Sequence, residues 1–194
     1  MKKQYAASEQ RKESILDAAI YIFSRYGFKK TTLEDIADAA GISKQGLYLH
    51  FQGKEEIFRA ANTKYLNDGL KHVDCALKMD DISLQERIYN IIDAWFGRHL
   101  LTLQPQSLDI FYARNNLSGM TSDIEIYRDA VCSRIATALE SSSEFSKLHN
   151  IRTPAEIAST LFMCGLSWKD AHGSHKKFME DMATCIKVCC QFQD

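Results

Sequence analysis

Lys44, Gln45 and Gly46 have the residue types and spacing of a segment that contacts DNA bases. They begin the second of two short predicted helices, which residues 39–43 join with Gly41 at the corner. A helix-turn-helix needs a small residue there so that the two helices can cross steeply. Its second helix lies in the major groove and presents its first residues to base edges. Lysine can donate to guanine and glutamine can pair with adenine, while a glycine lets the backbone come close to the DNA.

Other chemistries lack their sequence signatures. The chain has no nucleophile elbow, no HExxH motif and no glycine-rich phosphate loop. None of its six cysteines forms a C-x-x-C pair, and no histidine pair lies near them at zinc-finger spacing. Cys189 and Cys190 are adjacent and could sense oxidants, but a buried free cysteine is more commonly a small apolar residue. We therefore expect no enzyme, no cofactor and no metal site.

Hydrophobic spacing predicts four helices in the N-terminal part of the chain. Gly27 directly follows the first one, where a helix end favours a residue that can adopt positive φ. Thr32 and Asp35 form a capping-box start for the second, and Ser43 can cap the third. The four helices are expected at about residues 8–26, 32–40, 43–52 and 54–77.

Five more helices are predicted in the remainder of the chain. The best start signal combines a hydroxyl at Thr153, a proline at position 154 and a carboxylate at Glu156. No segment shows sustained β alternation, so the fold class is all-α with about nine helices. The five are expected at about residues 83–103, 105–117, 122–140, 153–173 and 174–192.

Positive charge is concentrated near the N-terminus. Residues 1–54 carry nine Lys or Arg against six Asp or Glu, whereas residues 55–194 carry fifteen against nineteen. This distribution is expected if only the N-terminal part meets phosphate. No run of 18 apolar residues and no export signal is apparent, which predicts a cytoplasmic protein without a membrane span.

Residues 11–58 resemble the DNA-binding domain of the TetR/AcrR family of bacterial transcriptional regulators. The matching residues keep their order and spacing over the whole stretch. They are Ile15 to Ala19, Phe23, Gly27, Thr31, Thr32, Ile36, Ala37, Ala40 to Ser43, Leu47, Tyr48, His50, Phe51, Lys54 and Glu55.

The resemblance implies a role for each residue at the matching positions. Lys44 and Gln45 would read bases, and Gly46 would lie against the DNA backbone. Leu47 and Phe51 are expected in the core, and a solvated surface position is the alternative for Lys44, Lys54 and His50. The residues implied to hold phosphates are Thr32, Tyr48, His50 and Lys54.

The C-terminal two thirds resembles the family only in length and helix pattern. Family members use this part for dimerisation and for a small-molecule pocket. The domains are accordingly predicted as 1–53 for DNA binding and 54–194 for effector binding and dimerisation, connected by the helix over 54–77.

Two sets of residues are candidates for these roles, and ordinary intrachain core is the alternative for every member. An apolar or aromatic effector would suit the first set. The pocket candidates are Trp95, Phe96, His99, Phe111, Tyr112 and Phe162. The dimer candidates are Leu161, Cys164, Trp168, Phe178, Met182 and Cys185.

The hypothesis that joins these features is a homodimeric repressor that an effector releases from a palindromic operator. Its rival is a ligand-binding or adaptor protein that has lost specific DNA binding. The sequence leaves open the effector, the operator, the regulated genes and whether the protein represses or activates.

Overall fold

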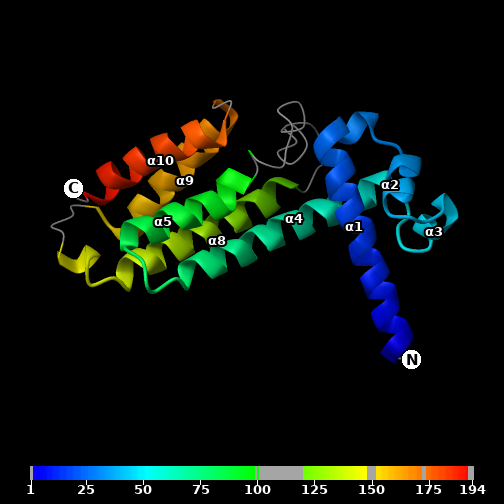
Figure 1. Ribbon diagram of the computed structural model, residues 1–194, viewed down its shortest axis with the longest axis horizontal. Coiled ribbons are helices and arrows are strands. Elements are labelled where there is room, and N and C mark those ends of the chain that lie inside the picture. The colour runs from blue at the N-terminus through cyan, green and yellow to red at the C-terminus, as the bar shows by residue number, and fades with distance from the viewer. Residues whose placement is uncertain (1, 99, 101–119, 148–151, 172–173, 192–194) are drawn as a thin grey trace. The chain divides into compact units, whose positions relative to one another are not determined.

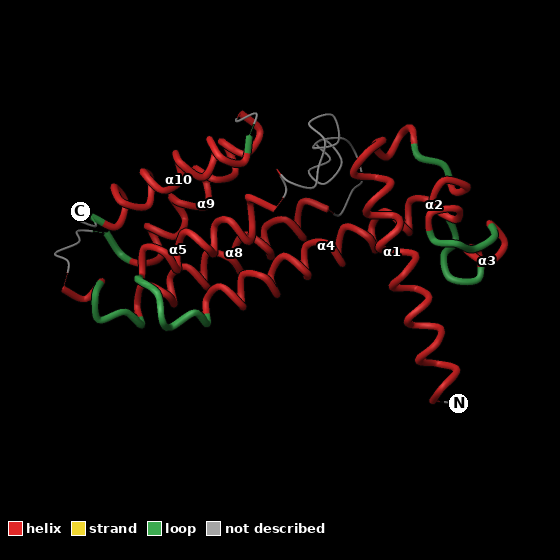
Figure 2. The backbone as a smooth tube through the Cα atoms, in the orientation of Figure 1, coloured by secondary structure: helices red, strands yellow, loops and turns green. Residues whose placement is uncertain are grey.

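The computed structural model describes residues 2–98, 100, 120–147, 152–171 and 174–191 (Figure 1). Over these residues the secondary structure is helical throughout, with eight α-helices and no strand (Figure 2). The all-α prediction is confirmed there. The helix predicted at 105–117 lies outside the described residues, as do the side chains of His99, Phe111 and Tyr112.

The chain divides into two compact units. The described residues of the first are 2–67, and those of the second begin at Asp68. Helix α4 (Lys54–Leu77) contributes residues to both units. Within the described ranges, no helix is both long enough and apolar enough to cross a bilayer.

The first unit contains α1 (Lys2–Lys30), α2 (Leu33–Ala39), α3 (Lys44–Tyr48) and the first part of α4. Its core includes a cluster of three aromatic rings. The ring centroid of Phe23 lies 5.2 Å from that of Phe58, and Phe28 lies 4.9 Å from Phe58. These contacts join α1 to α4, while Ile36 and Leu47 bring α2 and α3 into the same unit as fully buried residues.

Gly27 interrupts α1 as predicted. Its φ of 83° is unfavourable for any residue with a Cβ, and the helical direction changes there before a last turn reaches Lys30. The backbone carbonyl of Gly27 then accepts from the amide and the hydroxyl of Thr31, at 3.1 and 2.7 Å. These bonds lead the chain directly into the start of α2.

The second unit contains the C-terminal part of α4 and four further α-helices. Helices α8 and α9 pack together, α9 packs against α10, and α10 packs against α5 (Figure 1). A short 3-10 turn, η3 (Phe145–Lys147), follows α8. The four α-helices are α5 (Leu84–Ile92), α8 (Met120–Glu140), α9 (Pro154–Ala171) and α10 (His175–Cys190).

A helix over residues 83–103 was expected, and the described residues 84–98 are helical, but the helix is not regular. Helix α5 ends at Ile92 and passes into a π-helical turn, η1 (Asp93–Gly97). Tertiary contacts accompany the wider turn: the Asp93 carboxylate lies 2.6 Å from Nε2 of His175 at the start of α10. A side chain at position 97 would collide with that carboxylate, so Gly97 allows the close approach.

The predicted helix starts at Thr32, Ser83 and Thr153 are confirmed. At Thr32 and Ser83 a complete capping box forms with the carboxylate three residues on. At Thr153 the Glu156 carboxylate accepts from the backbone amide at 2.8 Å, and the hydroxyl accepts from the Glu156 amide at 3.2 Å. Helix α8 is already formed at Met120, the first described residue of this part of the chain, two residues before its predicted start.

Candidate nucleic-acid interface

The turn between α2 and α3 is built around Gly41. The residue has φ 65°, and nothing lies within 4 Å of the place where a Cβ would be. The backbone conformation, and not crowding, therefore requires glycine at this corner. The Ile42 amide donates to the Ala37 carbonyl at 3.0 Å and closes the turn. The prediction that Gly41 makes the turn is confirmed.

Ser43 starts α3 by capping. Its hydroxyl accepts from the Gly46 amide at 3.0 Å, which satisfies one of the amides that the first helical turn leaves open. The short helix is held against the unit by Leu47, which is fully buried, and by Phe51, which is 2% exposed. Both were expected in the core. Their burial turns the opposite face of α3 outward.

Lys44 is on that outward side but already has a partner. Its ammonium lies 2.6 Å from the Glu34 carboxylate on α2, and both side chains are about half exposed. The hydrogen bond to Lys44 lowers the pKa of Glu34 and raises the pKa of Lys44. The bond to Glu34 uses one of the three donor hydrogens of the ammonium, so a base contact by Lys44 would share the ammonium with this carboxylate.

Lys54 holds two backbone carbonyls. Its ammonium donates to the carbonyls of Phe28 and Thr31, each at 2.9 Å, and lies 4.5 Å from the Phe28 ring centroid. Two of its three donor hydrogens thus tie the first turn of α4 to the connection between α1 and α2. The phosphate role implied for Lys54 stays a prediction, and the structure gives the residue a stabilising role beside it.

Thr32 is similarly engaged at the start of α2. Its hydroxyl accepts from the Asp35 amide at 3.1 Å and lies 2.7 Å from the Asp35 carboxylate. These bonds lower the pKa of Asp35. The side chain of Thr32 is exposed, so a phosphate could reach it. The phosphate would then lie close to the Asp35 carboxylate.

The remaining predicted contacts lie at the surface. Gln45 is exposed, Tyr48 is half exposed and His50 is partly buried. A Cβ at Gly46 would meet Ser43 Oγ at 3.4 Å, an ordinary contact, so packing within the unit does not demand glycine there. A close approach to another molecule would explain the absence of a side chain.

Two features of this surface were missed from the sequence. Glu34 was not foreseen as the partner of Lys44, because ten residues separate them. Leu49 was not considered at all, yet it is 84% exposed. The available signal was its spacing: a residue two positions after the buried Leu47 lies on the far side of a helix.

Comparison with known proteins finds a family match in the helix-turn-helix segment. Residues 15–61 match the family described as bacterial regulatory proteins, tetR family. The resemblance seen in the sequence is thereby confirmed for this segment.

Relatives match the chain over part of its length. It is 39% identical over 66 residues to the uncharacterized HTH-type transcriptional regulator YfiR of Bacillus subtilis (strain 168), covering 34% of this chain and 32% of the relative. It is 48% identical over 48 residues to the biofilm operon icaADBC negative regulator IcaR of Staphylococcus epidermidis, covering 25% and 26%. The chain thus spans about a third or less of these relatives' length. They are named as transcriptional regulators.

Solved structures match nearly the whole chain in fold. A transcriptional regulator from Cytophaga hutchinsonii superposes with a TM-score of 0.74 at 20% identity, covering 92% of this chain and 96% of that one. FadR from Bacillus subtilis, solved with stearoyl-CoA, gives a TM-score of 0.69 at 13% identity, covering 94% and 99%. At these identities the likeness establishes the fold alone.

The described pocket candidates of the second unit are packed as core. Phe96 is fully buried, and Trp95 and Phe162 are 3% and 4% exposed. The Phe96 ring centroid lies 5.1 Å from that of Phe162 and 6.2 Å from that of Phe178. A Cβ at Gly165 would collide with the Phe96 ring, so α9 approaches it as closely as glycine permits.

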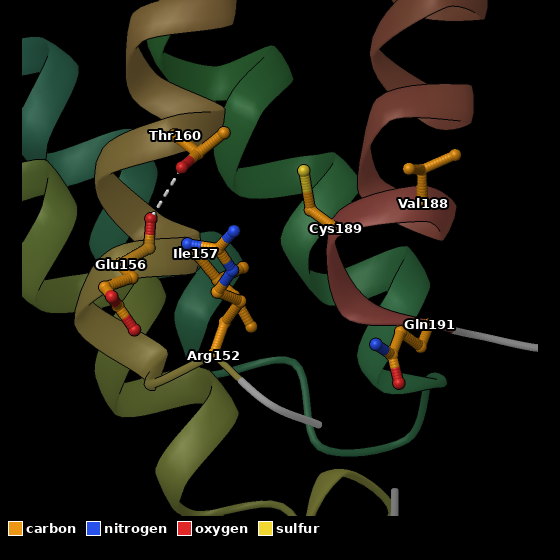
Figure 3. A pocket seen from close by; sticks show the side chains of 7 residues that line it. All are labelled: Arg152, Glu156, Ile157, Thr160, Val188, Cys189 and Gln191. Carbon is orange, nitrogen blue, oxygen red and sulfur yellow. Dashed lines mark hydrogen bonds between the residues drawn. The ribbon is translucent and has the colours of Figure 1, made fainter. Parts of the chain in front are cut away.

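Two hollows of the second unit lie elsewhere, on the outer surface of α9 and α10. One measures about 310 Å³, and Figure 3 shows it between the first turns of α9 and the end of α10. The other, of about 430 Å³, runs along α9 itself. The first is lined by Arg152, Glu156, Ile157, Thr160, Val188, Cys189 and Gln191. The second is lined by Ser159, Thr160, Met163, Cys164, Ser167 and Trp168.

The dimer candidates fall into two groups. Leu161, Phe178 and Met182 are fully buried within the chain's own core. Cys164, Trp168 and Cys185 are partly exposed and can contribute to a surface. The sequence did not point to Met163 and Val188, which are 53% and 72% exposed on α9 and α10.

The three thiols of α10 favour their protonated form. Cys185 Sγ and Cys189 Sγ lie 3.9 Å apart within α10. Burial raises the pKa of both, and it raises the pKa of Cys190 to about 12. Because the thiolate is the reactive form, this environment disfavours the thiol-sensing alternative.

Proposed function

We propose that the protein is a sequence-specific DNA-binding regulator that acts as a homodimeric repressor. One observation carries the proposal: α3 buries Leu47 and presents Lys44, Gln45 and Tyr48 outward, within the segment that matches the family. A short helix capped at its start and held by one buried face is suited to enter the major groove. We infer repression and not activation because two relatives are named as a negative regulator and a probable repressor.

A dimer and a palindromic operator follow from the small size of the reading helix. Helix α3 has five residues, so one copy makes few base contacts. Two copies on half-sites about 34–36 Å apart would roughly double the binding free energy. The apolar side chains of Met163 and Val188 on α9 and α10 offer a surface for the second copy.

A small-molecule effector would release the DNA by binding better to a conformation whose two heads do not fit the groove spacing. The fold shared with FadR, whose structure contains stearoyl-CoA, supports an apolar effector. We propose long-chain acyl-CoA as the first probe, with coenzyme A alone as its control. We expect long-chain acyl-CoA to dissociate a preformed protein–DNA complex and coenzyme A alone to leave the complex intact.

The experiment that tests DNA reading is selection of binding sites from random-sequence DNA, followed by affinity measurement at several salt concentrations. We expect an enriched sequence with two related halves. Lys44→Ala and Gln45→Ala should each weaken binding to it by about 1–3 kcal/mol and relax preference at one position per half. Lys176→Ala is the matched control, because this exposed lysine lies in the second unit.

The adaptor alternative makes the opposite prediction. Binding would then be weak, equal for all sequences and steeply reduced by salt, because only phosphate contacts remain. Sedimentation of the free protein separately tests the dimer. A monomer at micromolar concentration that still selects a two-halved site would remove the preformed dimer from the proposal.

A further inference from the structure

Leu49 is the most exposed large apolar side chain among the described residues, at 84%. It follows α3 directly as its C-cap residue and keeps helical geometry, with φ −71° and ψ −17°. Its amide donates to the Gly46 carbonyl at 3.3 Å, so the backbone that carries the side chain is fixed. The side chain contributes nothing to the core of the first unit.

The direction of Leu49 follows from its buried neighbours. Leu47 points into the unit, and two further residues turn a helix by about 200°. Leu49 therefore shares the outward side with Gln45, four residues earlier, and both side chains are exposed. An isolated exposed leucine is common in proteins. This one lies on the face of the helix that is proposed to enter the major groove.

The chemistry of that groove limits what a leucine can recognise. Base edges there present hydrogen-bond donors and acceptors, and the one apolar feature is the 5-methyl group of thymine. Leu49 has no polar atom in its side chain, so it cannot hydrogen-bond to a base edge. The apolar contact with a thymine methyl group is therefore the contact that Leu49 can make in this groove.

We propose that Leu49 reads a thymine by packing against its 5-methyl group, one helical turn beyond the base that Gln45 contacts. One turn rises about 5.4 Å, and successive bases are about 3.4 Å apart. The thymine should thus lie one or two base pairs from the position read by Gln45. This inference rests on the proposed function, since it requires α3 to enter the major groove.

The experiment replaces each thymine of the selected site, one at a time, with deoxyuridine, which lacks only the methyl group. Affinities are measured for the wild-type protein, Leu49→Ala, Leu49→Met and Ile126→Ala. Ile126 is the matched control, because it is 64% exposed but lies in the second unit. Since Leu49 is outside the core, both of its variants should fold, which their unfolding curves verify.

At one thymine in each half-site, deoxyuridine should weaken the wild-type and Ile126→Ala complexes about fourfold, the effect of one buried methyl group. The same replacement should leave Leu49→Ala unchanged and still weaken Leu49→Met. The salt dependence should be the same for all four proteins, because no phosphate contact changes.

Two other outcomes overturn the inference in distinguishable ways. If the wild-type protein binds thymine and deoxyuridine equally at every position, or if Leu49→Ala keeps the discrimination, Leu49 does not read a methyl group although DNA reading stands. If random-sequence selection enriches nothing, the proposed function fails and the inference fails with it.

Discussion

The two units of this chain expose their chemistry in opposite ways. In the first, Lys44 and Gln45 lie on the surface of a short helix, and a local turn and one capping residue fix the position of that helix. In the second, the aromatic residues that seemed suited to a ligand are packed against one another, as Phe96 is against Phe162 and Phe178. The exposed residues of a local motif such as the helix-turn-helix can be predicted from the sequence. Residues of a core and residues of a pocket have the same types and the same spacing.

The largest expected effect tests whether the aromatic residues of the second unit belong to its core. Phe96→Ala should lower the free energy of unfolding by about 3–5 kcal/mol, because a fully buried ring leaves a cavity. Urea unfolding followed by circular dichroism measures it. Ile126→Ala, at a position that is 64% exposed, should change stability by no more than about 0.5 kcal/mol. A near-neutral Phe96→Ala would return the residue to the ligand candidates.

The next effect separates stability from DNA contact in the first unit. Lys54→Met should cost about 1.5–3 kcal/mol of unfolding free energy, since two charge-assisted hydrogen bonds to the Phe28 and Thr31 carbonyls are lost. Lys44→Ala, which removes only an exposed ion pair, should have a much smaller effect on the unfolding free energy. The same unfolding measurement compares them. Equal costs would contradict the structural role given to Lys54.

A smaller effect distinguishes two glycines of the helix-turn-helix. Gly41→Ala should destabilise the unit by about 1–2 kcal/mol, because alanine must adopt a φ of 65°. Gly46→Ala should leave stability within about 0.5 kcal/mol and weaken DNA binding, because its Cβ fits the unit but faces the groove. Unfolding curves and binding isotherms of both variants give the answer. The reverse pattern would show that α3 does not approach DNA closely at Gly46.

The smallest expected effect concerns pH in the second unit. Arg134 donates to the Asp74 carboxylate at 2.5 and 3.2 Å and lowers its pKa. A depressed folded-state pKa gives stability that is present above the unfolded value of about 3.9 and is lost as pH falls through the folded value. Asp74→Asn should therefore flatten the stability profile below about pH 4 by a fraction of a kcal/mol, since the pair is partly exposed. An unchanged profile would show that the ion pair contributes nothing.

The helix caps and the turn between α2 and α3 were predictable because each depends on residues that are close in the sequence. Thr32 and Asp35 are three residues apart, and the positive φ of Gly41 is a property of one residue. The same holds for the burial of Leu47 and Phe51, which follows from helical spacing. The π-helical turn at Asp93–Gly97 was not predictable, because its carboxylate partner His175 is 82 residues away.

The sequence by itself determined the class of fold, the place of the helix-turn-helix and the side of α3 that faces outward. Tertiary structure decided how the charged residues are used: Lys44 is held by Glu34, and Lys54 bonds carbonyls 23 and 26 residues away. It also decided that Trp95, Phe96 and Phe162 pack as core. Helical periodicity specifies which way a side chain points, whereas the partner it meets depends on segments that only folding brings together.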